Sequence, residues 1–114
     1  MKYMILLFGD ESTYSTYTQE QMAADMQRHI DFGTWCMENG VTILGGEELH
    51  LSSTAKTFHA NGTEMDGPFL ELKEQLGGYY AIETDSLERA EDAARHAPTY
   101  GAVELRQIVE REEA

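Results

Sequence analysis

Residues 66–83 read DGPFLELKEQLGGYYAIE, and this stretch divides the chain into its structural parts. The first half opens with Asp66-Gly67-Pro68, which is good turn chemistry, and predicts a charged loop with a turn of helix at residues 70–75. The second half changes at Gly77-Gly78 into a strand at residues 79–83. A loop of this length is uncommon in a compact domain unless it binds something or is disordered. We therefore ask whether the loop covers a site.

Before this stretch, the sequence predicts a strand, a long helix and a second strand. Residues 2–8 are almost continuously apolar, which is typical of a central strand covered on both faces. The residues TQEQ from Thr18 form a capping-box pattern with Gln21 and predict a helix over residues 19–38, ending at Asn39-Gly40. A strand at residues 41–44 follows.

A hairpin precedes the opening stretch, and a helix and a strand follow it. Asn61-Gly62 predicts a two-residue turn between strands at 54–60 and 63–65. Asp85 is the predicted N-cap of a helix over residues 86–97, and the last strand is expected at residues 102–109.

This order of elements predicts one α+β domain over residues 1–114. Two helices on one face of a mainly antiparallel sheet give a ferredoxin-like fold. Such a layer leaves the other sheet face open, although residues 4–8 are apolar on both sides. Pairing two sheets face to face would cover them, so we expect a homodimer that forms a dimeric α+β barrel.

The charge of the chain restricts its partners. Lys and Arg number 8 against 21 Asp and Glu, a formal net charge of −13. This field repels phosphate backbones and anionic lipids, so neither nucleic acid nor a membrane is an expected partner. The single cysteine, Cys36, excludes an internal disulfide and suits the cytoplasm. The apolar run at residues 4–8 is too short for the core of a signal peptide.

His29 is the sharpest candidate for chemistry. On a helical wheel it shares one stripe with an apolar set that comprises Met22, Met26, Gly33, Cys36 and Met37. One interpretation is a core histidine bonded to a backbone carbonyl. The other is an imidazole that lines a cavity between helix and sheet and serves as acid, base or ligand. Phe32 and Trp35 lie outside this stripe. They are expected to be either interface anchors or the edges of a wide core.

Other reactive groups have plainer interpretations. Cys36 is about 10.5 Å along the helix from His29, which excludes a Cys–His dyad, so we expect a small buried residue. The four histidines are scattered, and we expect no metal and no cofactor. Gly45-Gly46 and Gly77-Gly78 match no phosphate-binding loop, and they predict strand bulges or close approach of a backbone or a ligand.

The stretch at 66–83 closely resembles the DGPFAETKE-type signature of a subgroup of the YCII-related superfamily. The similarity extends to KYMILLFGDE, GGEEL, SLERAEDAARHAP and VELRQI, although Leu70 and Leu72 stand where the family usually has Ala and Thr. The resemblance implies a ferredoxin-like fold that dimerises into a barrel, and genes that often neighbour those of extracytoplasmic sigma factors. It implies no settled activity. The superfamily is discussed as possible enzymes with a His–Asp pair in a cleft. His29 matches that histidine, and Asp66 is the candidate acid.

Two functions follow as hypotheses. The first is a lyase- or isomerase-type enzyme acting on a small molecule, with His29 as general acid or base and Asp66 orienting it. Lys73 would stabilise a developing oxyanion, and the other expected substrate-binding residues are Glu47, Gly67 and Tyr79. The second is a non-catalytic protein that binds a small ligand or a partner, in a regulatory role linked to sigma-factor circuits.

Overall fold

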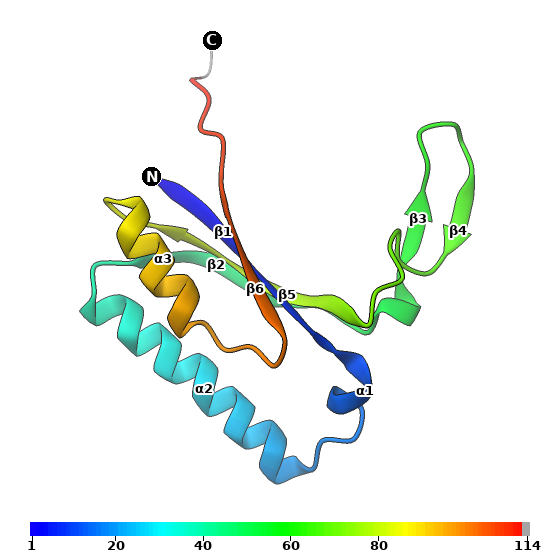
Figure 1. The fold of residues 1–114 in the computed structure, drawn as a ribbon, viewed down its shortest axis with the longest axis horizontal. Coiled ribbons are helices and arrows are strands. Elements are labelled where there is room, and N and C mark those ends of the chain that lie inside the picture. The colour runs from blue at the N-terminus through cyan, green and yellow to red at the C-terminus, as the bar shows by residue number, and fades with distance from the viewer. Residues whose placement is uncertain (113–114) are drawn as a thin grey trace.

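The computed structural model describes residues 1–112, which form a four-stranded antiparallel sheet with two helices on one side of it (Figure 1). The sheet strands, in the order β2-β5-β1-β6, belong to an α+β fold of the expected ferredoxin-like type. The elements are β1 (Lys2–Asp10), α1 (Glu11–Tyr14), α2 (Gln19–Glu38), β2 (Thr42–Glu48), the 3-10 turn η1 (Ser52–Thr54), β3 (Lys56–Phe58), β4 (Glu64–Asp66), β5 (Glu74–Glu83), α3 (Leu87–His96) and β6 (Ala102–Gln107).

The core lies between the sheet and the helices. Alternate residues of β1, Tyr3 and Ile5, are buried against the helices together with Ile82 of β5. Helix α3 contributes only alanines to this core, and small side chains allow it to approach the sheet closely. The buried residues of the two helices and their ends are Phe32, Cys36, Ala90, Ala93 and Ala97.

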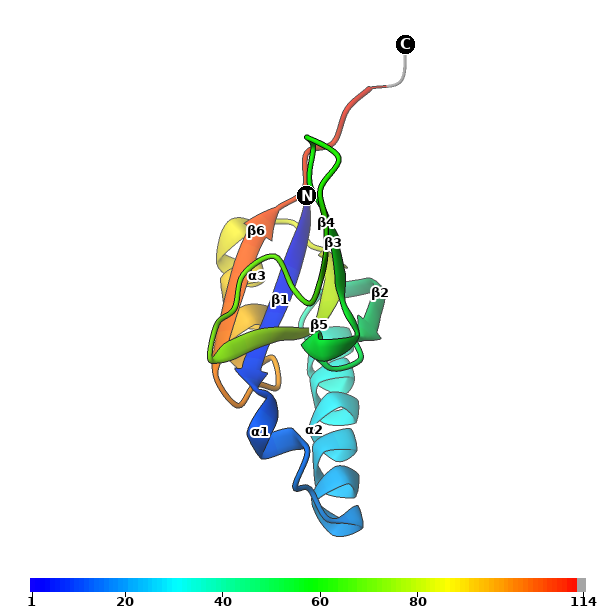
Figure 2. The same cartoon turned by 90° about the vertical axis from the view of Figure 1, so that its right-hand side faces the viewer.

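Helix α2 has the predicted bounds but buries only part of the predicted stripe. The capping box is present, since Gln21 N donates to Thr18 Oγ1 at 3.1 Å and Thr18 N donates to Gln21 Oε1 at 2.8 Å. Phe32 is in the core at 2% exposed, whereas Met22 and Met26 on the predicted apolar stripe are 60% and 62% exposed. The predicted stripe was therefore correct at Cys36, which is 1% exposed, and wrong at Met22 and Met26, because only the second half of α2 packs on the sheet. Met37, in the second half, is also exposed. The first half runs beyond the sheet toward α1 (Figures 1 and 2).

Several predicted boundaries were also wrong. The predicted turn of helix at residues 70–75 is absent because β5 already begins at Glu74 and continues through Gly77-Gly78. A bulge between Leu7 and Phe8 absorbs the change of register there. Strand β2 extends to Glu48 beyond the predicted end, and α1 was not expected. The N-cap of α3 is Ser86, whose Oγ accepts from Arg89 N at 3.2 Å, and not Asp85.

Strands β3 and β4 form a hairpin that projects away from the sheet and helices (Figure 1). The turn differs from the predicted two-residue type, because His59 N donates to Thr63 O and residues 60–62 lie between them. Gly62 has a φ of 94°, a conformation that favours glycine and completes a three-residue turn. None of the helices within residues 1–112 is long and apolar enough to cross a membrane.

Candidate functional site

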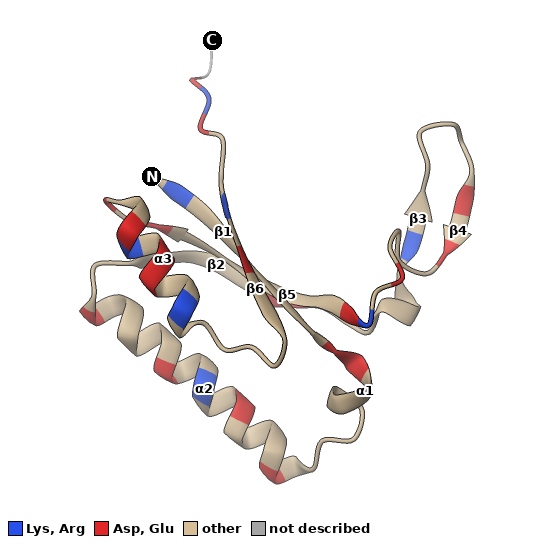
Figure 3. Ribbon diagram, in the orientation of Figure 1, with Lys and Arg blue, Asp and Glu red and all other residues tan. Residues whose placement is uncertain are grey.

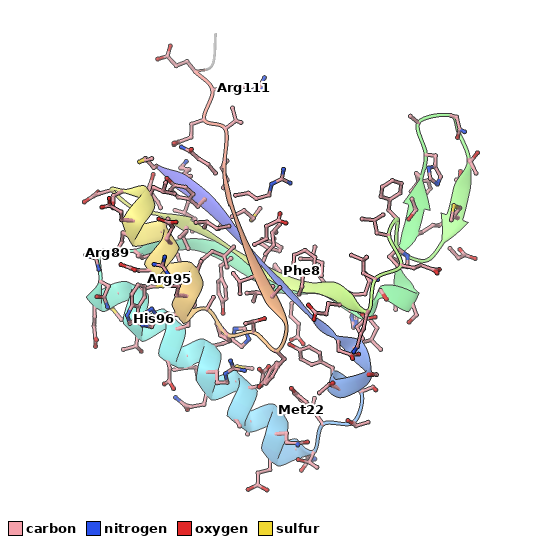
Figure 4. The ribbon with its side chains drawn as sticks, viewed as in Figure 1. Phe8, Met22, Arg89, Arg95, His96 and Arg111 are labelled. Carbon is pink, nitrogen blue, oxygen red and sulfur yellow. The ribbon has the colours of Figure 1, made fainter. Side chains whose placement is uncertain are left out.

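A cleft of about 570 Å³ lies where the first half of α2 leaves the sheet. Its walls are α1, α2, the ends of β1 and β5, and the segments 46–51 and 98–100. Figure 4 labels two lining residues, Phe8 on β1 and Met22 on α2. Met22 and Met26 therefore face a cavity and not the sheet, which explains their exposure. The volume is in the range that suits a small organic molecule.

His29 lies in the wall of this cleft between two polar partners. Its Nδ1 is 2.5 Å from the hydroxyl oxygen of Tyr80, which projects from β5. Its Nε2 is 3.9 Å from Oδ2 of Asp25, one helical turn earlier on α2. The partner of the imidazole is therefore a phenol, which contradicts the interpretation of a core histidine bonded to a backbone carbonyl. Asp25, His29 and Tyr80 form a chain of polar groups from helix to sheet.

One carboxylate oxygen of Asp25 accepts no hydrogen bond from the described residues. The side chain of Asp25 is 20% exposed, and its Oδ1 is buried without a donor among residues 1–112. A buried acceptor that lacks a donor costs about 1–3 kcal/mol. Asp25 pairs with no lysine or arginine of the described residues, so its charge is available to stabilise a protonated His29 imidazole through Oδ2.

Burial raises the pKa of Tyr80, and the neighbouring Cys36 and Asp25 raise it further. The phenol consequently keeps its proton at neutral pH. When the His29 imidazole is neutral, the Tyr80 hydroxyl donates a hydrogen bond to Nδ1. The ring hydrogen then lies on Nε2, on the side of Asp25. This arrangement allows a proton to pass between Tyr80 and His29.

Glycine at position 46 is what allows the Tyr80 ring to lie where it does. A Cβ on Gly46 would stand 2.7 Å from Cδ1 of Tyr80 and 2.8 Å from the backbone oxygen of Tyr79. A Cβ on Gly78 would stand 2.9 Å from the backbone oxygen of Glu47. Close backbone approach at the glycine pairs was predicted from the sequence and is confirmed at both positions.

Three tyrosines that line the cleft form an aromatic wall. The rings of Tyr14, Tyr17 and Tyr100 contact one another, with centroids 5.3 to 5.9 Å apart. The guanidinium carbon of Arg28 lies 4.4 Å from the centre of the Tyr100 ring, and Nη2 donates to Thr99 O at 3.1 Å. Burial, followed by the hydrogen bond with Tyr100, raises the pKa of Tyr17 to about 12. We call these three residues the tyrosine wall.

The sequence-predicted site residues fall into two groups. His29, Glu47 and Tyr79 line the cleft, and the last two are paired between β2 and β5. The other three lie outside the cleft lining: Asp66 is exposed on β4, Gly67 donates its N–H to Ala55 O at 2.7 Å, and Lys73 is exposed in the loop before β5.

Sequence reasoning missed Asp25 and Tyr80. The signal for Asp25 was its spacing, because residues four apart share one face of a helix. Tyr80 alternates with Tyr79 along β5, and only the strand's register shows which tyrosine faces the helices. Within residues 1–112, no three His, Cys, Asp or Glu side chains gather as a metal site requires.

Comparison with known proteins identifies relatives of the whole chain. The family model described as "YCII-related domain" matches residues 1–112. "Uncharacterized protein R00369" of Rhizobium meliloti (strain 1021) is 32% identical over an alignment 114 residues long. The alignment covers 95% of this chain and 92% of that protein. The name of this relative assigns no activity, so function must be argued from the cleft itself.

Proposed function

The chain belongs to the YCII-related family, and from that premise we propose that its cleft is the active site of an enzyme that moves a proton to or from a small molecule. The observation that supports this most strongly is the contact between Tyr80 and His29 at the cleft wall, with Asp25 on the other side of the imidazole. The imidazole is 31% exposed and within reach of an acid, as proton transfer requires.

In this mechanism Tyr80 contacts the substrate and His29 acts behind it. The phenol donates its proton to a carbon or oxygen of the bound molecule and recovers one from the His29 imidazolium. In the reverse direction Tyr80 accepts a proton from the substrate while its own proton passes to Nδ1 of His29. Asp25 stabilises the imidazolium that forms, as the carboxylate does in other acid–base chains of this kind.

Proton transfer of this type suits an isomerase or a lyase. Either reaction requires removal of a proton at one atom and its delivery to another atom or to a leaving group. Cys36 does not offer a competing nucleophilic route, because it is 1% exposed and burial raises the pKa of its thiol to about 11. A buried, protonated thiol is inert.

The test measures the incorporation of deuterium from solvent into a bound compound. The product of the reaction therefore does not have to be known in advance. Compounds that stabilise the protein against thermal unfolding are incubated with it in D₂O, and mass spectrometry follows the incorporation of deuterium. We expect at least one bound compound to gain mass with the wild type. The His29→Gln, Asp25→Asn and Tyr80→Phe variants should lose at least tenfold in rate, because each interrupts the chain of groups that carries the proton.

His59→Gln is the matched control, since it makes the same change in the exposed hairpin outside the cleft. This variant should exchange as the wild type does. Equal exchange in His29→Gln and His59→Gln would remove the imidazole from the mechanism. Binding without exchange in any variant, the wild type included, would favour the second candidate.

The second candidate is a non-catalytic protein that binds a small ligand, with the regulatory role considered from the sequence. The observation that favours it is that both ring nitrogens of His29 already face groups of the same chain. In that case the three residues would only shape the cleft. The deuterium experiment separates the two candidates.

We also propose that the chain acts as a homodimer. Two features support this: an open sheet face on the side away from the helices, and a hairpin segment with large exposed apolar side chains. Phe58 is 67% exposed and Phe69 is 70% exposed. Exposed apolar surface of this kind is typical of interfaces. Light scattering should give about twice the chain mass of 12.9 kDa, and a mass of one chain at micromolar concentration would refute the proposal.

A further inference from the structure

The charged side chains that line the cleft all have the same sign. Glu11, Asp25, Glu47 and Glu48 border it, and within the described residues no lysine or arginine does. Glu47 is paired with Tyr79 and so lies on the sheet face opposite to Tyr80, which leaves Glu11, Asp25 and Glu48 as the carboxylates on the helix side. In Figure 3 acidic positions occur on α1, along α2 and at the start of β5, and basic positions are few. Like charges at a binding surface cost several kcal/mol, so this lining disfavours a ligand with a carboxylate or a phosphate.

One of these carboxylates already has partners. Glu11 accepts hydrogen bonds from the backbone N of Ser52 at 2.6 Å and from its hydroxyl at 2.5 Å, so it holds the segment after β2 against α1. Asp25 and Glu48 form no salt bridge with a lysine or an arginine of the described chain, and the nearest cationic partner of Asp25 is His29. Their charge is available to a ligand.

The tyrosine wall is suited to a positive charge. The faces of tyrosine rings attract cations that lie within about 6 Å of the ring centre. The protein itself shows such a contact, because the Arg28 guanidinium lies over the Tyr100 ring on this wall. Arg28 is held there by Thr99 and is not part of the cleft lining.

The carboxylates lie close enough to the tyrosine wall to influence it. The pKa of Tyr14 is raised, and burial of the phenol is the largest cause. The charges of Asp25 and Glu48 and the neighbouring Tyr100 raise this pKa further, whereas Arg28 lowers it. Asp25 comes from α2 and Glu48 from β2, so negative charge reaches this ring from two elements of the cleft. Between the carboxylates, Met22, Met26 and Leu7 supply apolar surface.

From this arrangement we infer that the ligand is a small organic cation, an amine or ammonium compound with a flat apolar body. The ammonium group would lie between Asp25 and Glu48, and the apolar body would lie against the methionines and tyrosines. The inference rests on the proposed function in that it concerns the same cleft, and it names the class of molecule on which the enzyme acts.

The test compares three compounds with the same body and different charge: 2-phenylethylamine, 2-phenylethanol and 3-phenylpropionate. Their dissociation constants are measured at pH 7 by NMR titration, which also reports whether the shifts occur at Tyr14, Met22 and Met26. We expect the amine to bind at least tenfold more tightly than the carboxylate, a difference of about 1.4 kcal/mol, with the alcohol between them. The preference should weaken in high salt.

Two variants separate the cleft from the field of the whole protein. Glu48→Gln should weaken binding of the amine about threefold or more and leave the alcohol unchanged. Glu38→Gln removes the same charge from the far end of α2, outside the cleft lining, and should change nothing. Equal weakening in both variants, equal or tighter binding of the carboxylate, or no binding of any of the three compounds would each overturn the inference.

These outcomes are distinguishable from failure of the proposed reaction. Glu48 has no part in the proposed proton transfer, and His29→Gln leaves all the carboxylates in place. The amine preference should therefore persist in His29→Gln. A cleft that prefers the amine but exchanges no deuterium would keep the ligand class and reject the enzyme. Deuterium exchange into anionic compounds alone would keep the enzyme and reject the ligand class.

Discussion

Gly46→Ala should disconnect Tyr80 from His29 and destabilise the fold. The added Cβ would lie 2.7 Å from Cδ1 of the Tyr80 ring, about 0.8 Å closer than carbon atoms approach without repulsion. The Tyr79 oxygen, at 2.8 Å, belongs to the backbone of β5 and cannot move aside, so the Tyr80 ring must move. A shift of that size would lengthen the distance between the Tyr80 hydroxyl oxygen and Nδ1 of His29 from 2.5 Å to about the longest distance at which a hydrogen bond forms. Overpacking and the lost hydrogen bond together should cost about 2–4 kcal/mol.

Gly45→Ala is the matched control, because a Cβ on Gly45 meets no atom within 4 Å. Urea denaturation should therefore show a large loss of stability for Gly46→Ala and a change of at most about 1 kcal/mol for Gly45→Ala. Nitrogen NMR of the His29 ring should show an altered balance of tautomers in Gly46→Ala alone. The same stability and the same ring signals in both variants would refute the argument that glycine at position 46 positions Tyr80.

Two further predictions concern stability. Because burial raises the pKa of Cys36 from 9.0 to about 11 in the folded chain, the unfolded chain loses this proton first. The free energy of unfolding should therefore fall by about 2 kcal/mol between pH 9 and pH 11, and a pH series of urea titrations should show a shallower fall for Cys36→Ala. If the two profiles have the same slope, the buried thiol is not the cause. Thr18→Ala removes the cap of α2 and should cost about 1 kcal/mol in the same assay. Thr34→Ala in the middle of α2 should cost less, and the reverse order would contradict the role of the capping box.

The sequence predicted those parts of the fold that depend on local chemistry. The bounds of α2 follow from the Thr18 capping box and from Gly40, whose φ of 72° ends the helix in a conformation that glycine adopts without strain. The ferredoxin-like topology also follows, since two helices that cross one face of an antiparallel sheet leave few arrangements of the strands. The family match over residues 1–112 is consistent with both.

The predictions that failed depend on tertiary contacts. The apolar stripe of α2 was assigned as though the whole helix packed on one surface, and this assumption placed Met22 on the buried face. Phe32 was left as an interface anchor or the edge of a wide core, and it is in the core at 2% exposed. Glu74 was included in the predicted turn of helix at residues 70–75, whereas it lies in β5 and pairs with Asp10 across the sheet. No local pattern could show that β1 has a partner at that position.

The same tertiary contacts explain why the histidine on α2 is a candidate for chemistry at position 29 and not elsewhere. Phe32 and Cys36, toward the C-terminal end, are buried against the sheet, and an imidazole there would lose access to a ligand. Met22 and Met26, toward the other end, are mostly exposed, and an imidazole there would have no group from the sheet to hold it. His29 lies at the boundary, where Tyr80 still reaches the helix and the cleft has already opened. The chemistry proposed for the cleft therefore depends on where α2 parts from the sheet, and the absence of a side chain at Gly46 leaves room for the Tyr80 ring at that boundary.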